Sequence, residues 1–460
     1  MNKFLFYLGL FGGKITYFVF KLFGRNASHS PGAVATTICK DFIALCPKAK
    51  NVVVVCATNG KTTTANMVSD MLEAMGETVS SNRLGSNIVP GVTTAFINSL
   101  TFFGKVKADS VILEVDERAS RLIVPGACPN FVLVPNIFRD SLKRNAYPEY
   151  IFSVIENSIQ NKDGVLILNS DDIFSSRLLE NGENKRVFFG LGQQENEKTI
   201  NENLIFDHSF CPMCKKTLEW DYLRYHHIGK CHCPNCGFQS KTADYLGTTI
   251  DTKAHTLEIT SKGKALNLPL IDGNLFNIYN EIGIFALLSE MGFSPETIQA
   301  AFTKTTVVSS RLEVKKVGNH EVIQAMAKGQ SCVSTCRTLD FVGHTPGKKA
   351  VIFVVDDMEE RLESSEFIGW IYDGDYEYLD NEDTIQLIVA GPRHLDYRVR
   401  LRLAGFEPEK IVNLFDENEI KNSIDYDRVE KIFILYDTST YSLAMDVKKQ
   451  IIETIKHLEV

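Results

Sequence analysis

The residue types best suited to chemistry in this chain lie in one polar turn, residues 57–63, which reads Ala-Thr-Asn-Gly-Lys-Thr-Thr. Such a turn at a helix N-terminus presents backbone N–H groups to an anion, its lysine reaches the outer phosphates of a nucleotide, and a hydroxyl holds Mg²⁺. We therefore predict a nucleotide site whose phosphate contacts come from one short run: Thr58, Asn59, Gly60, Lys61, Thr62 and Thr63.

The segments on either side of this turn have the pattern that a phosphate-binding loop needs. Residues 52–56 form a mostly β-branched run, as in a strand buried on both faces of a parallel sheet. Residues 65–75 repeat apolar side chains at helical spacing and end at Gly76, a good helix stop. An ordinary strand-to-helix turn is the alternative, but the complete strand–turn–helix context favours phosphate binding.

Residues 111–117 read as a second buried strand that ends in acid. A carboxylate at the end of a strand beside a phosphate loop is well placed to bind Mg²⁺. We predict Glu114 as a magnesium ligand, with Asp116 and Glu117 either assisting or simply solvated. Two further buried runs, 131–134 and 165–168, also end in polar residues, so we expect a parallel α/β sheet with one polar edge.

A polar, glycine-containing loop, residues 81–87, holds Asn82, Arg83 and Asn87. Open α/β sheets place ligands at loops of this kind, beyond the carboxyl ends of their strands. A plain surface connection is the equally weighted alternative.

Two Cys-Pro-x-Cys knuckles, separated by 18 residues, form an insert at about residues 205–245. This spacing closes a tetrahedral zinc site in a ribbon of short strands, and four protein ligands make the metal structural. We predict the ligands Cys211, Cys214, Cys233 and Cys236, and Cys231 is near enough to replace Cys233.

The composition is that of a globular protein, with 460 residues, 44% hydrophobic and 23% charged, enough for two or three domains. A net charge of −8 argues against broad nucleic-acid binding, so we expect no nucleic-acid partner. Eleven cysteines in a chain without secretory architecture favour reduced thiols and a metal site over disulfides.

The N-terminal residues 1–24 are rich in Phe, Leu and Tyr, and Lys14 interrupts the apolar run well short of a bilayer span. We expect an amphipathic helix here. Basic residues beside aromatic ones suit contact with an anionic membrane surface, and packing against the protein's own core is an alternative of equal weight.

The strand and helix pattern restarts after residue 310, with buried runs at 351–355, 385–389 and 432–435. We predict three regions: an N-terminal helical segment, 1–40, a central ATP-binding domain, 41–310, with the zinc ribbon inserted in it, and a C-terminal Rossmann-like α/β domain, 311–460.

The Thr-Asn-Gly-Lys-Thr-Thr loop resembles that of the Mur ligases and folylpolyglutamate synthases, which activate a carboxylate as an acyl phosphate before an amine attacks it. Over nearly the entire chain, the order of motifs is similar to that of the MurT family, the Mur-ligase-like subunits of lipid II isoglutaminyl synthases. Besides the loop and the four cysteines, the shared motifs are residues 113–117, 136–140, 168–172, 277–280, 310–313, 370–373 and 391–393.

The resemblance implies a ligase that uses ATP and Mg²⁺ to phosphorylate the α-carboxylate of D-glutamate in the lipid II stem peptide. Ammonia from a partner glutaminase, GatD, then displaces phosphate to give D-isoglutamine. The resemblance also implies a cytoplasmic protein, at the inner face of the plasma membrane if residues 1–24 touch the bilayer.

The resemblance also assigns roles to residues of this chain. Lys61 and Glu114 would act in catalysis, and Asp373, or its neighbour Asp375, would complete a Cys-His-Asp arrangement in the glutaminase. The resemblance further implies that Thr62 and Glu114 hold Mg²⁺. The remaining assignments are nucleotide contacts from Asn277, Asn280 and Arg311, and a substrate-side loop with Asn82, Arg83 and Asn87.

The chain departs from the family pattern in three places, one of which is Ala57, where glycine is common. Ser141, Lys143 and Asn145 follow Asp140, so that a position that is acidic in the family becomes basic, and Gly329 and Gln330 stand where the family has Asn-Pro. An inactive, nucleotide-binding paralogue that serves as a scaffold is therefore one alternative. An interaction protein built on the zinc ribbon is the other.

Overall fold

The computed structural model describes residues 2–83, 86–140, 147–195, 197–271, 273–305, 312–327, 331–355 and 368–458. The chain forms two compact units. Unit 1 comprises residues 1–138, 148–201 and 207–307, and unit 2 comprises residues 139–147, 202–206 and 308–460.

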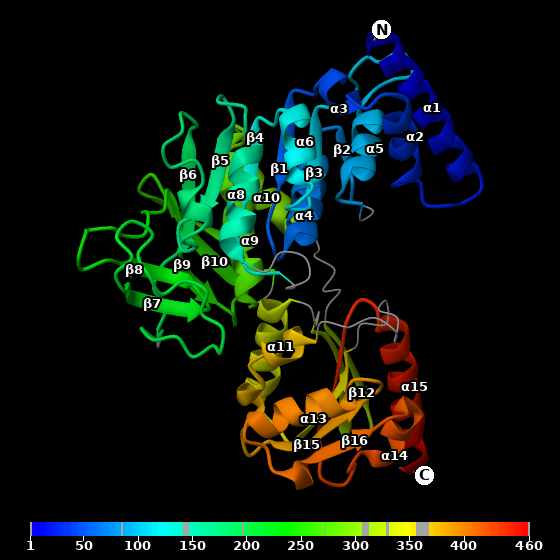
Figure 1. The fold of residues 1–460 in the computed structure, drawn as a ribbon, viewed down its shortest axis with the longest axis vertical. Helices are drawn as coiled ribbons and strands as arrows, with labels where there is room; N and C mark the ends of the chain where they lie inside the picture. Colours follow the sequence, from blue (N-terminus) through cyan, green and yellow to red (C-terminus); the bar gives the residue numbers. More distant parts are fainter. Residues whose placement is uncertain are drawn as a thin grey trace. The chain divides into compact units, whose positions relative to one another are not determined.

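Unit 1 is built on a nine-stranded sheet with the order β11-β10-β9-β6-β5-β4-β1-β3-β2 (Figure 1). In this spatial order, each strand from β2 across to β9 is parallel to its neighbour. The last two strands, β10 and β11, pair in the antiparallel direction. The strands are β1 (Asn51–Val55), β2 (Val79–Ser81), β3 (Ser110–Glu114), β4 (Phe131–Val134), β5 (Val165–Asn169), β6 (Arg186–Leu191), β9 (Tyr245–Asp251), β10 (Thr256–Ser261) and β11 (Lys264–Pro269). The four buried runs that the sequence predicts are thus the adjacent strands β5, β4, β1 and β3.

Helices cover both faces of this sheet, because its central strands are apolar on both faces. Val54 packs in one core with Phe96 and Ile123, whereas Leu133 lies on the other face against Gly283. The helices are α2 (Ser30–Ile38), α3 (Phe42–Leu45), α4 (Lys61–Ala74), α5 (Val89–Ser99), α6 (Ser120–Ala127), α8 (Pro148–Ser158), α9 (Leu275–Glu290) and α10 (Pro295–Lys304), with a short 3₁₀ turn, η1 (Ser175–Arg177).

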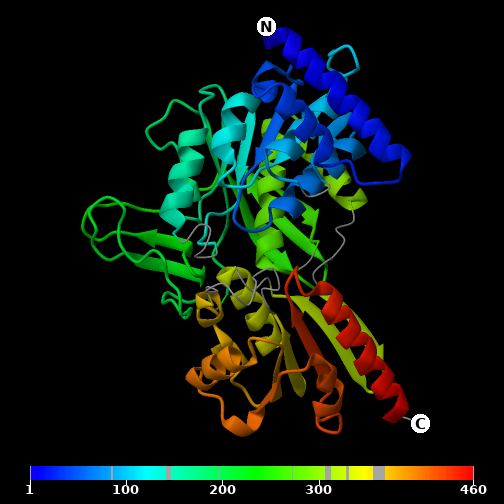
Figure 2. The same ribbon diagram turned by 45° about the vertical axis from the view of Figure 1, so that its right-hand side comes forward.

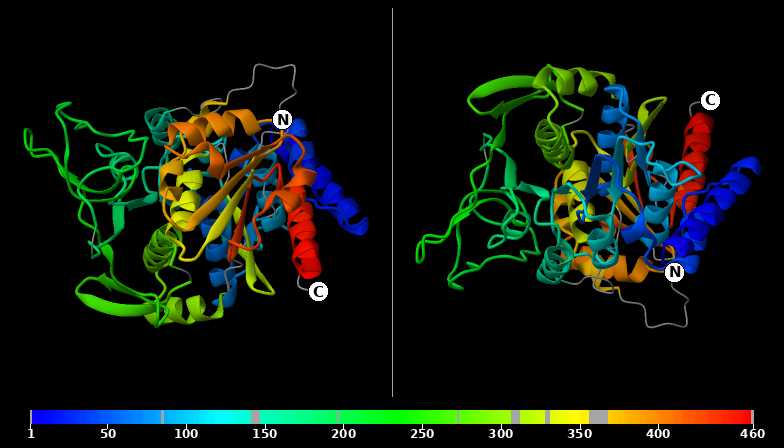
Figure 3. Two further views of the ribbon diagram at one scale, coloured as in Figure 1. Left: turned by 90° about the horizontal axis from the view of Figure 1, so that it is seen from below. Right: turned by 90° about the horizontal axis from the view of Figure 1, so that it is seen from above.

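The cysteine-bearing insert lies between β6 and β9 and contains an antiparallel pair, β7 (Glu219–Tyr225) and β8 (Ile228–His232). Within unit 1 it lies on the opposite side from the N-terminal helix (Figure 3). The α/β class and the inserted cysteine cluster are as the sequence predicts.

The N-terminal segment forms one helix, α1 (Asn2–Leu22), along the outside of unit 1 beside α2 and α5 (Figure 2). Its inner face includes Phe6, Leu10 and Lys14, which are buried. The Lys14 ammonium donates a hydrogen bond to the Leu100 carbonyl at 2.6 Å. By length and composition alone α1 could also cross a membrane.

Unit 2 contains a six-stranded sheet with the order β12-β13-β17-β14-β15-β16, in which only the β12–β13 pair of the described strands is antiparallel. The strands are β12 (Leu312–Val317), β13 (His320–Met326), β14 (Lys349–Val354), β15 (Thr384–Ala390), β16 (Ile411–Leu414) and β17 (Lys431–Tyr436). The three predicted runs of this region are β14, β15 and β17.

Helices cover this second sheet on both faces as well. Phe353 packs with Leu339 and Tyr397 on one face, and Ile352 packs with Ile451 on the other. The helices are α11 (Cys332–His344), α12 (Gly369–Tyr372), α13 (His394–Leu403), α14 (Ile420–Ser423) and α15 (Tyr441–Leu458), with the 3₁₀ turns η2 (Tyr376–Leu379), η3 (Pro408–Lys410) and η4 (Glu417–Glu419).

Candidate nucleotide and metal sites

The polar turn lies between β1 and α4, as the sequence predicts. Gly60 immediately precedes α4 with a φ of 81°, a left-handed conformation that residues with a side chain rarely adopt. The first N–H groups of α4 belong to Lys61, Thr62 and Thr63, and a helix leaves such groups without partners inside the helix. The N-terminus of α4 therefore has the backbone arrangement of an anion site.

The segment that follows β4 holds this turn in place. Phe138 N–H donates to Thr58 Oγ1 at 3.0 Å, and Thr58 Oγ1 donates to the Phe138 carbonyl at 3.2 Å. Asn136 accepts the Asn59 N–H at 2.9 Å and donates from Nδ2 to the Asn59 carbonyl at 2.9 Å. Thr58 and Asn59 are thus fixed at the turn by protein contacts, and their contact with phosphate stays a prediction.

Lys61 forms a nearly buried ion pair with Glu117. Its Nζ lies 3.1 Å from both carboxylate oxygens, and the two side chains are 13% and 3% exposed. Burial, the largest single effect, lowers the pKa of Lys61, but the ion pair with Glu117 and the weaker effects of Cys56 and Asp116 together outweigh it, so that the pKa lies above its ordinary value. Lys61 is therefore held as a cation at the turn.

Glu114 lies at the end of β3, directly opposite Val55 in the parallel register of β1 and β3. The residue is buried, and its carboxylate accepts a hydrogen bond from Asn87 Nδ2 at 3.1 Å. The Asn82 side chain bonds to the Glu114 backbone, with Nδ2 donating to the carbonyl at 2.8 Å and Oδ1 accepting the N–H at 2.9 Å. Asn82 and Asn87 thus both position Glu114.

Arg83, the third residue predicted for the substrate loop, contacts a different element. Its guanidinium lies 2.9 Å from Asp70 and 3.3 Å from Glu73, both on the exposed side of α4. The structure therefore brings Asn82 and Asn87 to Glu114 and places Arg83 on the surface of α4.

Asn280, which is on α9, lies against the phosphate turn. A Cβ atom on Gly60 would come within 2.9 Å of Asn280 Nδ2. This nitrogen is buried and, among the described residues, has no hydrogen-bond partner. Asn277 lies one helical turn earlier on α9 and is half-buried. Gly60 has no side chain to fill the space beside Asn280, and the buried Asn280 Nδ2 can donate a hydrogen bond to a ligand. Both features fit a nucleotide at this place.

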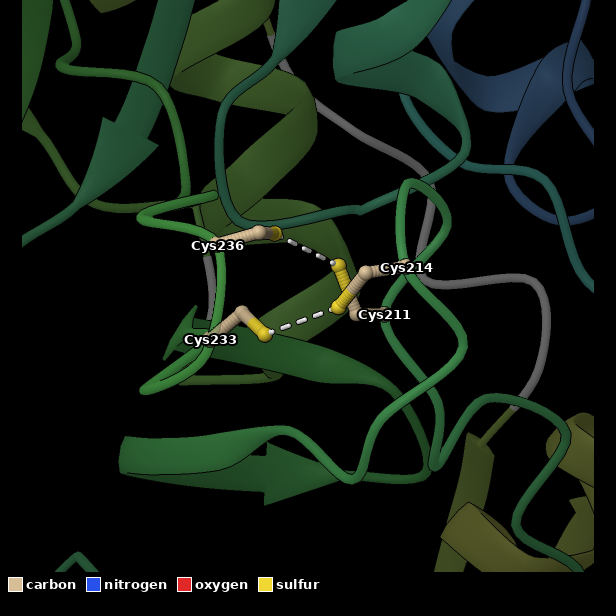
Figure 4. Close-up of side chains that lie close together, drawn as sticks. All are labelled: Cys211, Cys214, Cys233 and Cys236. Atoms are coloured by element: carbon tan, nitrogen blue, oxygen red, sulfur yellow. Dashed lines mark hydrogen bonds between the residues drawn. The ribbon is translucent and has the colours of Figure 1, made fainter.

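The four predicted zinc ligands lie together, with two on each of two facing loops (Figure 4). The sulfurs of Cys211 and Cys236 are 3.5 Å apart, as are those of Cys214 and Cys233, and all four lie within 4.8 Å of one another. Tetrahedral zinc with Zn–S bonds of about 2.3 Å needs sulfurs about 3.8 Å apart. The cluster therefore fits a structural zinc ion.

Cys231 lies outside this cluster. Its sulfur contacts Ser240 Oγ at 3.5 Å, and burial raises the pKa of its thiol to about 11. The geometry therefore favours Cys233 over Cys231 as the fourth ligand.

A buried arginine that the sequence did not single out anchors the insert to the sheet. Arg224 of β7 lies 2.7 Å from Asp171 and 2.5 Å from Glu197, and its side chain is 1% exposed. The Tyr279 hydroxyl donates to the same Asp171 carboxylate at 2.7 Å. Because Tyr279 is on α9, this network joins the insert to the helix that carries the two candidate nucleotide asparagines.

In unit 2, the two candidate triad aspartates have different surroundings. The Asp375 carboxylate is buried and accepts the Leu204 N–H at 2.6 Å and Asn203 Nδ2 at 2.8 Å. The Asp373 side chain is 20% exposed and lies 3.6 Å from the Arg139 guanidinium. Asp375 therefore serves the internal packing of unit 2, and Asp373 is the more accessible carboxylate.

Several predicted positions lie outside the described residues. These are the nucleotide candidate Arg311 and the departures from the family pattern at Ser141, Lys143, Asn145, Gly329 and Gln330.

Comparison with known families gives two matches. Residues 55–236 match the Mur ligase middle domain, and residues 330–444 match the MurT ligase C-terminal domain. The chain is a homologue of MurT.

Two MurT relatives show how far this likeness extends. The MurT subunit of the lipid II isoglutaminyl synthase (glutamine-hydrolyzing) of Staphylococcus aureus strain COL is 28% identical over 407 residues, covering 88% of this chain and 89% of that protein. The corresponding subunit of Streptococcus pneumoniae strain ATCC BAA-255 / R6 is 24% identical over 446 residues and covers 96% of each chain.

Solved structures show the same fold as this MurT homologue. A pseudomurein peptide ligase type C from Methanothermus fervidus has a TM-score of 0.65 at 18% identity, covering 90% of this chain and 81% of that one. The MurF ligase of Thermotoga maritima in complex with ADP has a TM-score of 0.54 at 12% identity, covering 93% and 85%. The protein thus has a Mur-ligase fold.

Proposed function

We propose that this MurT homologue is the ligase subunit of a lipid II isoglutaminyl synthase, which amidates the α-carboxylate of D-glutamate in the stem peptide. The observation that carries the proposal is the phosphate turn of a Mur ligase middle domain, with Lys61 and Glu114 at its edges, in a chain that also matches the MurT C-terminal domain.

The proposed reaction has two steps. A carboxylate oxygen attacks the γ-phosphorus of ATP, and ADP leaves with the electron pair of the broken P–O bond. The lone pair of ammonia then attacks the acyl carbon of the acyl phosphate, inorganic phosphate leaves, and the nitrogen loses a proton to give the amide. Water must be kept from the acyl phosphate until ammonia arrives, since water would return it to the carboxylate.

The residues of the candidate site would have separate roles in binding phosphate, nucleotide and Mg²⁺. Lys61 and the first N–H groups of α4 would bind the phosphates, and Asn277, Asn280 and Arg311 would contact the nucleotide. Thr62 and Glu114 would hold Mg²⁺, which supplies positive charge that neutralises the phosphate oxygens. Asn82 and Asn87 would keep Glu114 in place, and together with Arg83 they stay proposed members of the substrate-side loop.

The proposed zinc ion has a structural role. Four thiolates leave no vacant coordination position, so the metal would hold the insert together without taking part in the reaction.

A partner supplies the ammonia in this proposal. The names of the curated relatives, "glutamine-hydrolyzing" and "subunit", describe a synthase that has a further chain. We propose a GatD-like glutaminase whose catalytic histidine is oriented by Asp373, and a cytoplasmic location at the inner face of the plasma membrane, where lipid II is made available.

The experiment that tests the proposal is an amidation assay. The protein is co-purified with a glutaminase from the same genome and incubated with a soluble muramyl pentapeptide, ATP, Mg²⁺ and either glutamine or ammonium. We expect a product whose mass is lower by the difference between OH and NH₂ with both nitrogen sources. ATP binding without product from either source would contradict the proposal and favour the scaffold alternative.

A further inference from the structure

The outer face of α1 carries one continuous apolar stripe. Its residues recur every three or four positions and are each between 44% and 70% exposed: Phe4, Leu8, Phe11, Ile15, Phe18 and Leu22. At about 1.5 Å per residue, the stripe extends over about 27 Å, nearly the whole helix. Isolated apolar side chains on a surface are ordinary, but a contiguous row of this length marks an interaction site.

A second segment of unit 1 extends the stripe. Phe102 and Phe103, in the loop after α5, are 54% and 85% exposed. The Phe102 ring centroid lies 6.4 Å from that of Phe11, and Lys14 ties the start of this loop to α1 through the Leu100 carbonyl. The stripe and these two phenylalanines therefore form one surface, which we call the apolar ridge.

The charge around the apolar ridge has the sign opposite to that of the protein as a whole. The chain carries a net charge of −8, yet its first forty residues contain no Asp or Glu. Lys3, Lys21 and Arg25 are exposed near the ends of α1, and Lys105 and Lys107 are exposed beside the two phenylalanines. Apolar side chains framed by cations are the pattern that binds to an anionic lipid surface.

The inner face of α1 shows why the helix would lie on a membrane and not cross it. A Cβ atom on Gly9 would come within 3.0 Å of the Ala35 carbonyl, and one on Gly13 within 2.6 Å of the Ile97 side chain. Together with the buried Lys14, these close contacts commit one side of α1 to the protein. The outer side of α1, which carries the apolar ridge, is left for lipid.

We propose that the apolar ridge is a docking surface for an anionic lipid bilayer, with α1 lying parallel to the membrane plane. The purpose of this surface rests on the proposed function, because a lipid-linked stem peptide is presented at a membrane. Its lipid binding does not depend on that function. A second copy of this chain is a less suitable occupant, because it would bring a second set of cations against the first.

The test is co-sedimentation of the full-length protein with vesicles of phosphatidylglycerol and phosphatidylcholine, or of phosphatidylcholine alone. We expect binding to the anionic vesicles that weakens as salt rises and little binding to the neutral ones. The variant Phe18→Ser/Phe103→Ser should lower the apparent affinity by roughly tenfold or more. The matched control is Phe415→Ser, a phenylalanine of unit 2 that is 73% exposed and should leave binding unchanged.

Three results would overturn the proposal. The first is equal binding by the double variant and the control. The second is binding that resists salt and alkaline carbonate, which would indicate an inserted helix. The third is absence of binding to the anionic vesicles, and a dimer that the double variant dissociates would then identify a second copy of this chain as the occupant.

The vesicle assay is independent of the ligase reaction. The double variant should keep wild-type turnover with soluble muramyl pentapeptide, so a failure of the ligase proposal appears as no product whether or not the protein binds vesicles.

Discussion

At the scale of single residues, Lys61 has two alternative partners: the Glu117 carboxylate that it contacts and the phosphate that ATP would bring. The contact spans 56 positions of the sequence, and both groups are nearly buried. Such a pair contributes little net stability when intact, because burying two charges is costly, but loss of one partner leaves the other buried and uncompensated.

This asymmetry gives a prediction for three variants. Lys61→Met and Glu117→Gln should each lower the free energy of unfolding by about 3 kcal/mol, whereas Lys61→Met/Glu117→Gln should recover most of the loss. Both variants that lack Lys61 should turn over ATP with ammonium on the order of 10² to 10³ times more slowly, because phosphate charge is no longer matched. Urea unfolding and the amidation assay measure the two effects.

The control for this cycle is Lys162→Met, which removes an exposed pair with Glu183 whose side chains are 71% and 72% exposed. It should cost less than about 1 kcal/mol. A double variant whose loss of stability equals the sum of the two single losses would show that Lys61 and Glu117 are not coupled.

The phosphate turn was predictable because its signal is local: strand, turn and helix follow one another in 25 residues, 51–75. The partners of the turn were not. Asn136 and Glu117 reach it through the parallel register of β4, β1 and β3, and no short stretch of sequence states which strands are neighbours. The sequence alone therefore predicts Glu117 only as assisting or solvated, and it predicts no role for Asn136 at the turn.

At the scale of elements, the insert has one feature that neighbouring residues in the sequence predict and one that depends on residues outside the insert. The spacing of the cysteines predicts the four-sulfur cluster, which the structure contains. The Arg224 network that attaches the insert involves Asp171 and Glu197, far away in the sequence, and it has no motif of its own.

The zinc ligands of the insert are tested with two variants, each of which replaces one cysteine by serine. Wild-type protein and Cys231→Ser should each contain stoichiometric zinc by elemental analysis, whereas Cys233→Ser should lose the metal and melt at a lower temperature. Wild-type protein without zinc, or metal retained by Cys233→Ser and lost from Cys231→Ser, would refute the assignment.

For the N-terminal helix, the sequence predicts either packing against the core or contact with a membrane. In the structure, α1 has one face suited to each. An amphipathic pattern defines the two faces of a helix but not what covers them. Packing against the core is confirmed for the inner face by Phe6 and Leu10, and membrane contact of the outer face stays a prediction.

At the scale of the whole molecule, the fold class followed from the sequence because runs of buried strands alternate with helices in both units. The division into units is less simple than the three contiguous regions that we proposed. Segments 139–147 and 202–206 belong to unit 2, although they lie within the predicted central domain. A linear reading of a sequence cannot show that a loop leaves one unit to join another.

The proposed function couples glutamine hydrolysis in the partner to amidation in this chain, and this coupling gives a prediction for unit 2. Asp373→Asn should abolish amidation with glutamine, because the partner's histidine loses its orienting carboxylate, and should leave amidation with ammonium unchanged. Both reactions are measured on the co-purified complex.

The control is Asp375→Asn, at the neighbouring carboxylate that accepts hydrogen bonds from Leu204 and Asn203. It should lower stability and reduce both reactions to the same extent. Equal loss of both reactions in Asp373→Asn would instead give Asp373 a structural role.

The central claim is that this chain activates a carboxylate as an acyl phosphate. The most direct measurement uses a muramyl pentapeptide with the heavy oxygen isotope in the D-glutamate α-carboxylate, together with ATP, Mg²⁺ and ammonium. Mass spectrometry of the inorganic phosphate should then show one heavy oxygen transferred for each amide formed. Amide formed with unlabelled phosphate would contradict an acyl phosphate and the account built on it.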